Sequence, residues 1–196
     1  DKPRPYEKNM LQWIIVLYDG NLGTSYTIPW EIFKGMKKFK PRRKLRLKAE
    51  MYRGKYGFSI TISTHDRYPW FEHYPDLGDI LAEMILELSL ARNATVYAWC
   101  IMPDHVHILL EDTDIVELVR RFKGKLVPAA RKIEPHRKLW NRSFYDHVLR
   151  NEESLGDAAM YIWWNPVRKG LVEKPCDYPL SGSLEWPDWK ERFFGS

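Results

Sequence analysis

Met102-Pro103-Asp104-His105-Val106-His107-Ile108-Leu109-Leu110 is a β-strand pattern that carries two histidines one residue apart. Successive side chains of a strand point to opposite faces, so His105 and His107 project from one face and Val106 and Ile108 from the other. Neutral imidazole is the commonest protein ligand for metals, and a strand holds its ligands at fixed spacing. The pair therefore predicts a divalent-cation site. Packing or hydrogen bonding at a strand end is the alternative reading.

The segments around this strand alternate between strand and helix patterns. The pattern predicts strands at 56–64, 94–101, 105–111 and 144–149 and helices at 76–93, 114–132 and 151–165. Pro128 is expected to kink or interrupt the second helix. This order is α+β, and it predicts a ferredoxin-like antiparallel sheet with helices packed on one face.

The two ends of the chain differ from this middle region. Apolar runs at 11–18 and 26–30 flank the turn formers of 19–23, which predicts a β-rich N-terminal extension over residues 1–33. A basic arm follows at 34–55, the main domain spans 56–170, and an irregular C-terminal strap spans 171–196.

Composition narrows the class of protein. The 196 residues carry a net charge of +5 with a pI of about 9.1, which favours a polyanionic partner. Cys100 and Cys176 form no zinc or disulfide pattern, which predicts a reducing, cytoplasmic setting. No apolar run approaches the roughly 20 residues that span a bilayer, and the polar start is not a signal peptide, so no membrane association is expected.

The basic arm is the strongest charge feature, with Glu50 as its one acid. Such a block is either a solvated surface helix or a contact for phosphates, and we expect the second because lysine and arginine displace counterions from nucleic acid. A further basic surface is expected on the helix at 114–132. The residues expected to contact DNA are Lys37, Lys38, Lys40, Arg42, Arg43, Lys44, Arg46, Arg120, Arg121 and Lys123.

The last predicted helix carries Tyr161 and Asn165, which are four positions apart and therefore neighbours on one face. Tyrosine has a free pKa near 10, yet a nearby metal or base favours its attack on a phosphodiester. The amide oxygen of asparagine is a ligand for hard cations such as Mg²⁺ or Mn²⁺. The spacing alone favours a tyrosine packed in the core over a nucleophile.

Three ordered motifs carry a family resemblance. They are Met-Pro-Asp-His-Val-His-Ile-Leu-Leu at 102–110, Ser-Phe-Tyr-Asp-His-Val-Leu-Arg at 143–150 after Trp140, and Tyr-Ile-Trp-Trp-Asn-Pro-Val-Arg-Lys-Gly-Leu-Val at 161–172. Over roughly 56–183 the chain resembles the REP-associated tyrosine transposases, which belong to the HUH single-strand transposase superfamily.

The resemblance implies a metal-dependent enzyme that recognises a single-stranded DNA hairpin and cleaves or rejoins one strand through a 5′-phosphotyrosine. It implies His105 and His107 as the metal-binding pair, Tyr161 as the nucleophile and Asn165 as a further metal ligand. The implied cofactor is Mg²⁺ or Mn²⁺, and the implied state is a monomer or homodimer.

Other residues and functions stay open beside this prediction. Tyr145 is a competing nucleophile or a stacking residue, and His147 and His65 are candidates for supporting the site. A hairpin-binding regulator with the same fold and no cleavage is the principal alternative function. A hydrolase that uses an activated water is the third, although the motif strand contains no carboxylate base.

Overall fold

The structure is a computed structural model that describes residues 15–19, 24–28, 57–112, 114–149 and 155–195. The chain forms two compact units, one of residues 1–43 with 188–196 and the other of residues 44–187. In the first unit, strands β1 (Ile15–Asp19) and β2 (Thr24–Ile28) pair antiparallel. Helix α7 (Trp189–Phe194) packs against β1.

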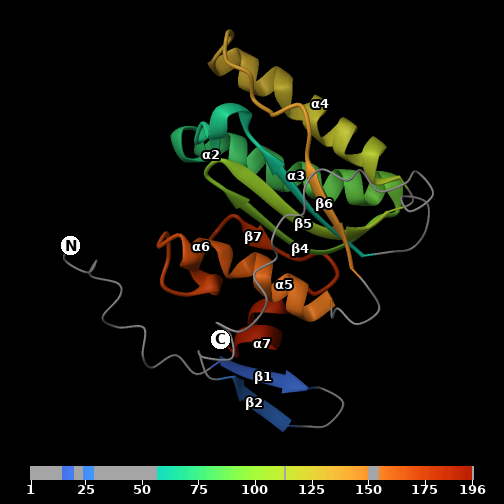
Figure 1. The fold of residues 1–196 in the computed structure, drawn as a ribbon, viewed down its shortest axis with the longest axis vertical. Coiled ribbons are helices and arrows are strands. Elements are labelled where there is room, and N and C mark those ends of the chain that lie inside the picture. Colours follow the sequence, from blue (N-terminus) through green and yellow to red (C-terminus); the bar gives the residue numbers. More distant parts are fainter. Residues whose placement is uncertain (1–14, 20–23, 29–56, 113, 150–154, 196) are drawn as a thin grey trace, which may run out of the picture. The chain divides into compact units, whose positions relative to one another are not determined.

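The second unit is built on a five-stranded sheet in the order β6-β3-β5-β4-β7, in which all neighbours are antiparallel (Figure 1). Its strands are β3 (Phe58–Ser63), β4 (Thr95–Met102), β5 (His105–Glu111), β6 (Tyr145–Val148) and β7 (Ser181–Gly182). The order of the first four in this unit is that of a ferredoxin-like sheet, so the predicted α+β fold class is confirmed. The predicted strap contributes β7 as the fifth strand.

Two long helices cover one face of this sheet, α3 (Pro75–Arg92) and α4 (Ile115–Ile133) (Figure 1). Their apolar sides pack on Val106, Ile108 and other buried side chains of the strands. Of the two effects expected of Pro128, a kink or an interruption, the interruption does not occur, because α4 continues through this residue. Apolar residues before and after the proline lie in the core, and this packing outweighs the lost hydrogen bond.

A buried ion pair fixes the connection between β5 and α4. Arg92, at the end of α3, donates to both carboxylate oxygens of Asp112 at 2.7 and 2.6 Å, and the Asp112 side chain is fully buried. Asp112 also accepts from the backbone N–H of Asp114, whose own side chain caps α4 by accepting from the N–H of Glu117 at 3.0 Å. These bonds hold the start of α4 beside the end of β5.

The opposite face of the sheet is covered in part by α5 (Leu155–Trp163), followed by the short α6 (Asn165–Arg168). Helix α5 packs on β4 and β5, and the indole N–H of Trp163 donates to the carbonyl of Gly182 in β7 at 3.1 Å. Figure 1 shows α5 and α6 across the sheet from α3 and α4. The expectation of helices on one face thus describes α3 and α4, and α5 adds a second layer.

Three short helical turns fall where the sequence indicates loops: η3 (His65–Arg67), α2 (Trp70–His73) and η4 (Pro175–Asp177). Trp70 and Phe71 of α2 are buried in the main core. Within the described ranges, no helix combines the length and the apolar character needed to cross a membrane.

Candidate functional site

The histidine pair lies on β5, which runs between β3 and β4 near the centre of the sheet. The alternation of the strand turns Val106 and Ile108 into the core under α3 and α4 and leaves His105 and His107 on the α5 face. This arrangement agrees with the prediction from the strand pattern. A central strand has partners on both sides, so the spacing of the two imidazoles is rigidly held.

The two imidazoles point their Nε2 atoms at each other, at a distance of 3.0 Å. Their other ring nitrogens are both engaged: Nδ1 of His105 contacts Oδ1 of Asp104 at 2.5 Å, and Nδ1 of His107 contacts Oγ1 of Thr61 at 2.9 Å. A carboxylate or hydroxyl on the far nitrogen orients an imidazole and selects its tautomer. Both lone-pair nitrogens can therefore face the same point above the sheet.

The surroundings keep His107 poorly protonated and Asp104 ionised. Burial lowers the pKa of His107 well below its usual range, and the positive charges of His105, Arg168 and Arg67 act in the same direction. Burial would raise the pKa of Asp104, but the hydrogen bond with His105 and the charges of His105 and Arg67 outweigh it, so its pKa is lowered. The site thus combines the neutral imidazole of His107 with the carboxylate of Asp104, which is held against the far nitrogen of His105.

If the two histidines hold a metal ion, a further side-chain ligand from the described residues would be an amide or a hydroxyl. Among the described residues, no group of three or more histidine, cysteine, aspartate or glutamate side chains is placed to hold a metal ion. The amide of Asn165 donates to the carbonyls of Tyr161 and Ile162 at 3.1 and 3.0 Å, at the end of α5. Its contacts make it a cap of that helix, and its role as a ligand stays a prediction.

Tyr161 lies on α5, the helix that packs on the strand of the histidine pair. Its side chain is 37% exposed, and the guanidinium carbon of Arg168 lies 4.1 Å from the centre of its ring. Arg168 also donates to the carbonyl of Tyr161 at 2.5 Å. The tyrosine is therefore held beside a cation and is not a core residue.

Arg168 is the residue that the sequence interpretation missed. Its charge helps to lower the pKa of His107, and it partly offsets the burial that raises the pKa of the Cys100 thiol to about 12; His107 and Cys100 are cross-strand partners on the α5 face. Arg168 therefore acts on both parts of the site: its charge affects His107, and its guanidinium contacts the Tyr161 ring. Its position two helical turns after Tyr161, within the third motif, was the signal available.

Tyr145 lies on the same sheet face as the histidine pair. In the ladder, Thr61 pairs with His107 on one side and with Tyr145 on the other, and directly opposed residues share a face. Tyr145 is 50% exposed on the edge strand β6, two strand spacings or about 9.6 Å from β5. His147 follows on the same face, opposite Ser59.

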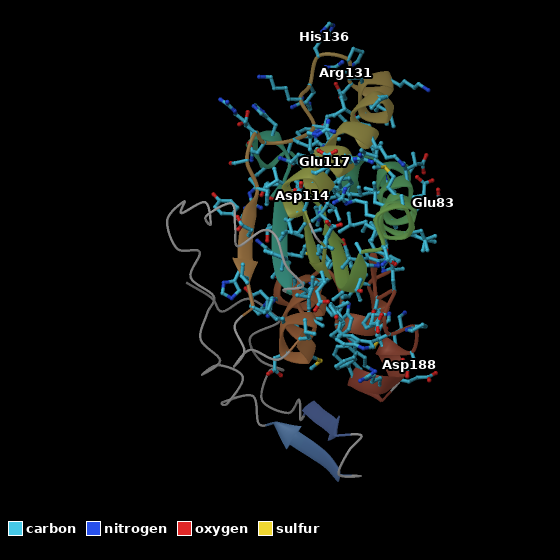
Figure 2. The ribbon with its side chains drawn as sticks, turned by 90° about the vertical axis from the view of Figure 1, so that its right-hand side faces the viewer. Glu83, Asp114, Glu117, Arg131, His136 and Asp188 are labelled. Atoms are coloured by element: carbon cyan, nitrogen blue, oxygen red, sulfur yellow. The ribbon has the colours of Figure 1, made fainter. Side chains whose placement is uncertain are left out.

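The remaining predicted residues are placed as follows. His65 contacts the exposed Asp66 at 3.0 Å in η3. Arg120 and Arg121 pair with Glu117 at 2.6 and 2.7 Å on the exposed side of α4. Figure 2 labels Glu117 and Asp114, near the start of that helix.

Lys123 points its ammonium group inward, to the carbonyls of Asn141, Arg142 and Ser143 at 2.9, 3.4 and 3.2 Å. Burial lowers its pKa. Its visible role is therefore to fasten the segment before β6 to α4. The arm residues predicted to contact DNA, from Lys37 to Arg46, lie outside the described residues.

Comparisons with known proteins agree with the fold and the motifs. The family model described as "Transposase IS200 like" matches residues 50–162. A putative REP-associated tyrosine transposase of Haemophilus influenzae is 34% identical over 98 residues, covering 43% of this chain and 56% of that protein. A REP-associated tyrosine transposase of Escherichia coli is 26% identical over 106 residues, covering 52% and 62%. The chain thus aligns with less than two thirds of the length of either relative.

A solved structure of a REP-associated tyrosine transposase bound to a REP hairpin shares the fold, with a TM-score of 0.57 and 21% identity over 71% of this chain and 81% of that one. At this identity the likeness concerns the fold alone. The family model, in contrast, spans more than half of the sequence and includes both the histidine pair and Tyr161. The chain belongs to the IS200-like transposase family.

Proposed function

We propose that this protein is a metal-dependent transposase that recognises a hairpin in single-stranded DNA and cleaves or rejoins one strand through a 5′-phosphotyrosine at Tyr161. The observation that carries the proposal is the convergence of the Nε2 atoms of His105 and His107 on the sheet face against which α5 packs.

The donor set fits a hard divalent ion. Two neighbouring ligands of an octahedral ion with bonds of about 2.1 Å lie about 3.0 Å apart, which equals the distance between the two Nε2 atoms. The edge of a tetrahedral zinc site with similar bonds is about 3.4 Å. His105 and His107 would therefore hold Mg²⁺ or Mn²⁺, with Asn165 as the further protein ligand that the family resemblance implies. When bound, the ion supplies positive charge that polarises the scissile phosphate.

The residues of the chain account for the covalent step. The phenolic oxygen of Tyr161 attacks the phosphorus and loses its proton; an O–P bond forms to the tyrosine, the bond to the 3′ oxygen breaks, and that oxygen takes up a proton. The products are a 5′-phosphotyrosine and a free 3′-hydroxyl. Because the phosphodiester energy is retained, attack by another 3′-hydroxyl reverses the step and rejoins DNA.

Arg168 is well placed to assist this step. Its guanidinium lies over the Tyr161 ring, with the guanidinium carbon 4.1 Å from the ring centre. Its hydrogen bond to the Tyr161 carbonyl also fixes the ring relative to α6. We assign it as a positioning residue for the nucleophile.

The DNA partner is proposed from the relatives and from charge. The solved relative is bound to a REP hairpin, and this chain carries a net charge of +5. The exposed arginines Arg120 and Arg121 and the basic arm at 34–55 are expected to contact phosphates in a salt-dependent, sequence-independent way.

The test uses a hairpin oligonucleotide with single-stranded flanks, incubated with the protein and Mg²⁺ or Mn²⁺ and then separated under denaturing conditions. We expect a protein–DNA adduct with the wild type and none with Tyr161→Phe or after chelation of the metal. Tyr145→Phe is the matched control. It also removes a tyrosine hydroxyl, from a residue of β6 on the sheet face that α5 covers, and this variant should still form the adduct.

Each other outcome assigns a different function. An adduct that persists in Tyr161→Phe and disappears in Tyr145→Phe would show that the nucleophile is Tyr145 of β6. Cleavage without any adduct would indicate a hydrolase. Tight binding with neither cleavage nor adduct under both metals would indicate the hairpin-binding regulator.

A further inference from the structure

A hollow of about 440 Å³ opens at the C-terminal end of α4, away from the histidine pair. Its apolar floor is formed by Val127, Leu139 and Trp140, and its rim is basic, with Arg131, His136 and Lys138. Among the residues that the structure describes, no acidic side chain lines it. Figure 2 shows the labelled Arg131 and His136 close together at this end of the molecule.

The floor of the hollow is rigid. The Trp140 indole donates to the carbonyl of Lys123 at 3.2 Å and packs against the rings of Phe71 and Phe122. Leu139 is 4% exposed. An apolar floor that is already ordered takes up a flat, apolar group with little loss of conformational freedom.

The rim is chemically available. Arg131, His136 and Lys138 are exposed and make no ion pair or side-chain hydrogen bond with the described residues. Two other basic residues of the lining already have partners within the protein. Lys123 donates to backbone carbonyls, and the guanidinium carbon of Arg137 lies 3.9 Å from the centre of the Tyr68 ring. Uncompensated cations around an apolar floor complement a group that is both flat and anionic.

The hollow is also connected to the histidine pair through the sheet. The N–H of His65 donates to the carbonyl of Leu139, and the N–H of Asn141 donates to the carbonyl of Ser63, so residues 139–141 run beside the end of β3. Ser63 pairs with His105 on its other side. The wall of the hollow is therefore about 9.6 Å, or two strand spacings, from the strand of the histidines.

We propose that this hollow binds one nucleotide with an unpaired base from the single-stranded DNA that flanks the hairpin. The base would lie on Val127, Leu139 and Trp140, and its phosphate would contact Arg131 and Lys138. A base inside a duplex cannot enter, so the hollow selects an unpaired position. The inference rests on the proposed DNA-binding function and adds a second anchor that sets the distance between hairpin and cleavage site.

The experiment measures the affinity of hairpin oligonucleotides whose flank carries a base-free nucleotide at each position in turn. We expect one position at which loss of the base weakens binding by the wild type about tenfold, because stacking of one base has this magnitude. Val127→Glu, which places a carboxylate on the floor, should bind all these oligonucleotides alike. Val116→Glu, the same substitution at an exposed site of α4, should retain the difference.

A second pair of variants tests the rim without disturbing the core. The double variant Arg131→Ala, Lys138→Ala should reduce the slope of log affinity against log salt by about 0.7, since that is the contribution of one neutralised single-strand phosphate. Lys132→Ala removes a charge from α4 outside the hollow and serves as the control for nonspecific charge.

The inference is overturned if no flank position responds to base removal, or if the responding position is unaffected by both Val127→Glu and the rim variant. Adduct formation at saturating DNA reports separately on the proposed chemistry. Loss of the adduct in the wild type would reject the enzyme while leaving the binding result interpretable.

Discussion

The two faces of β5 differ in composition although they belong to one strand. Val106, Ile108 and Leu110 face α3 and α4 and are 0 to 2% exposed in an apolar core. His105 and His107 face α5, among hydrogen bonds to Asp104 and Thr61. Because the faces alternate along the strand, substitutions on the apolar face are expected to lower the free energy of unfolding and leave the proposed activity intact. Substitutions of the histidines are expected to do the reverse.

The largest effect is expected on the polar face. His107→Gln should reduce adduct formation about 10³-fold, because removal of one of two histidine ligands eliminates several kcal/mol of metal-dependent stabilisation. The free energy of unfolding should change by no more than ~1 kcal/mol. Rates of adduct formation and denaturant unfolding check both parts, and a fully active variant would exclude His107 as a ligand.

The adjacent residue should show the reverse. Ile108→Ala leaves a cavity beneath α3 and α4 and should lower the free energy of unfolding by about 3 kcal/mol. Below the unfolding midpoint, its rate of adduct formation should stay within about threefold of the wild type. Large loss of activity in the fully folded variant would show that the two faces are coupled.

A smaller effect tests the support of the pair. Asp104→Asn removes the anion behind His105 and should weaken Mn²⁺ binding about tenfold, the lower end of the range for such partners. Titration calorimetry measures it directly. Asp66→Asn, at the exposed partner of His65, is the control and should leave the affinity unchanged.

The smallest effect is expected at the edge of the polar face. Tyr145→Phe keeps the ring and removes the hydroxyl, so DNA affinity and adduct yield should both remain within about twofold of the wild type. Tyr145→Ala removes the stacking surface as well and should weaken binding of single-stranded DNA about tenfold. Equal effects of the two substitutions would argue for the hydroxyl and against stacking.

Much of this arrangement follows from local patterns. Period-two alternation places His105 and His107 on one face, and helical periodicity predicts α3 and α4 almost to their ends, because both signals depend on neighbours in sequence. The continuity of α4 through Pro128 was not predictable in this way. It depends on packing by residues of other elements.

The residues that contact His107 and Tyr161 could not be predicted from local patterns either, because these contacts also depend on the tertiary fold. Thr61 meets His107 across 46 residues, and only the strand register brings them together. Arg168 contacts Tyr161 because α6 turns back toward α5, a geometry that helix propensity does not encode. The face chosen by α5 likewise depends on the tertiary fold, which explains why helices were expected on one side.

The corner between α5 and α6 has a consequence for how this protein can be recombined with its relatives. Asn165 and Arg168 both donate to the carbonyl of Tyr161, so the tyrosine takes its orientation from residues that follow it by four and seven positions. Residues 161–168 therefore form one structural block that has to be transferred as a whole. A chimaera that exchanges the tyrosine helix should be joined after Arg168, since a junction inside the block would separate the proposed nucleophile from the groups that orient it.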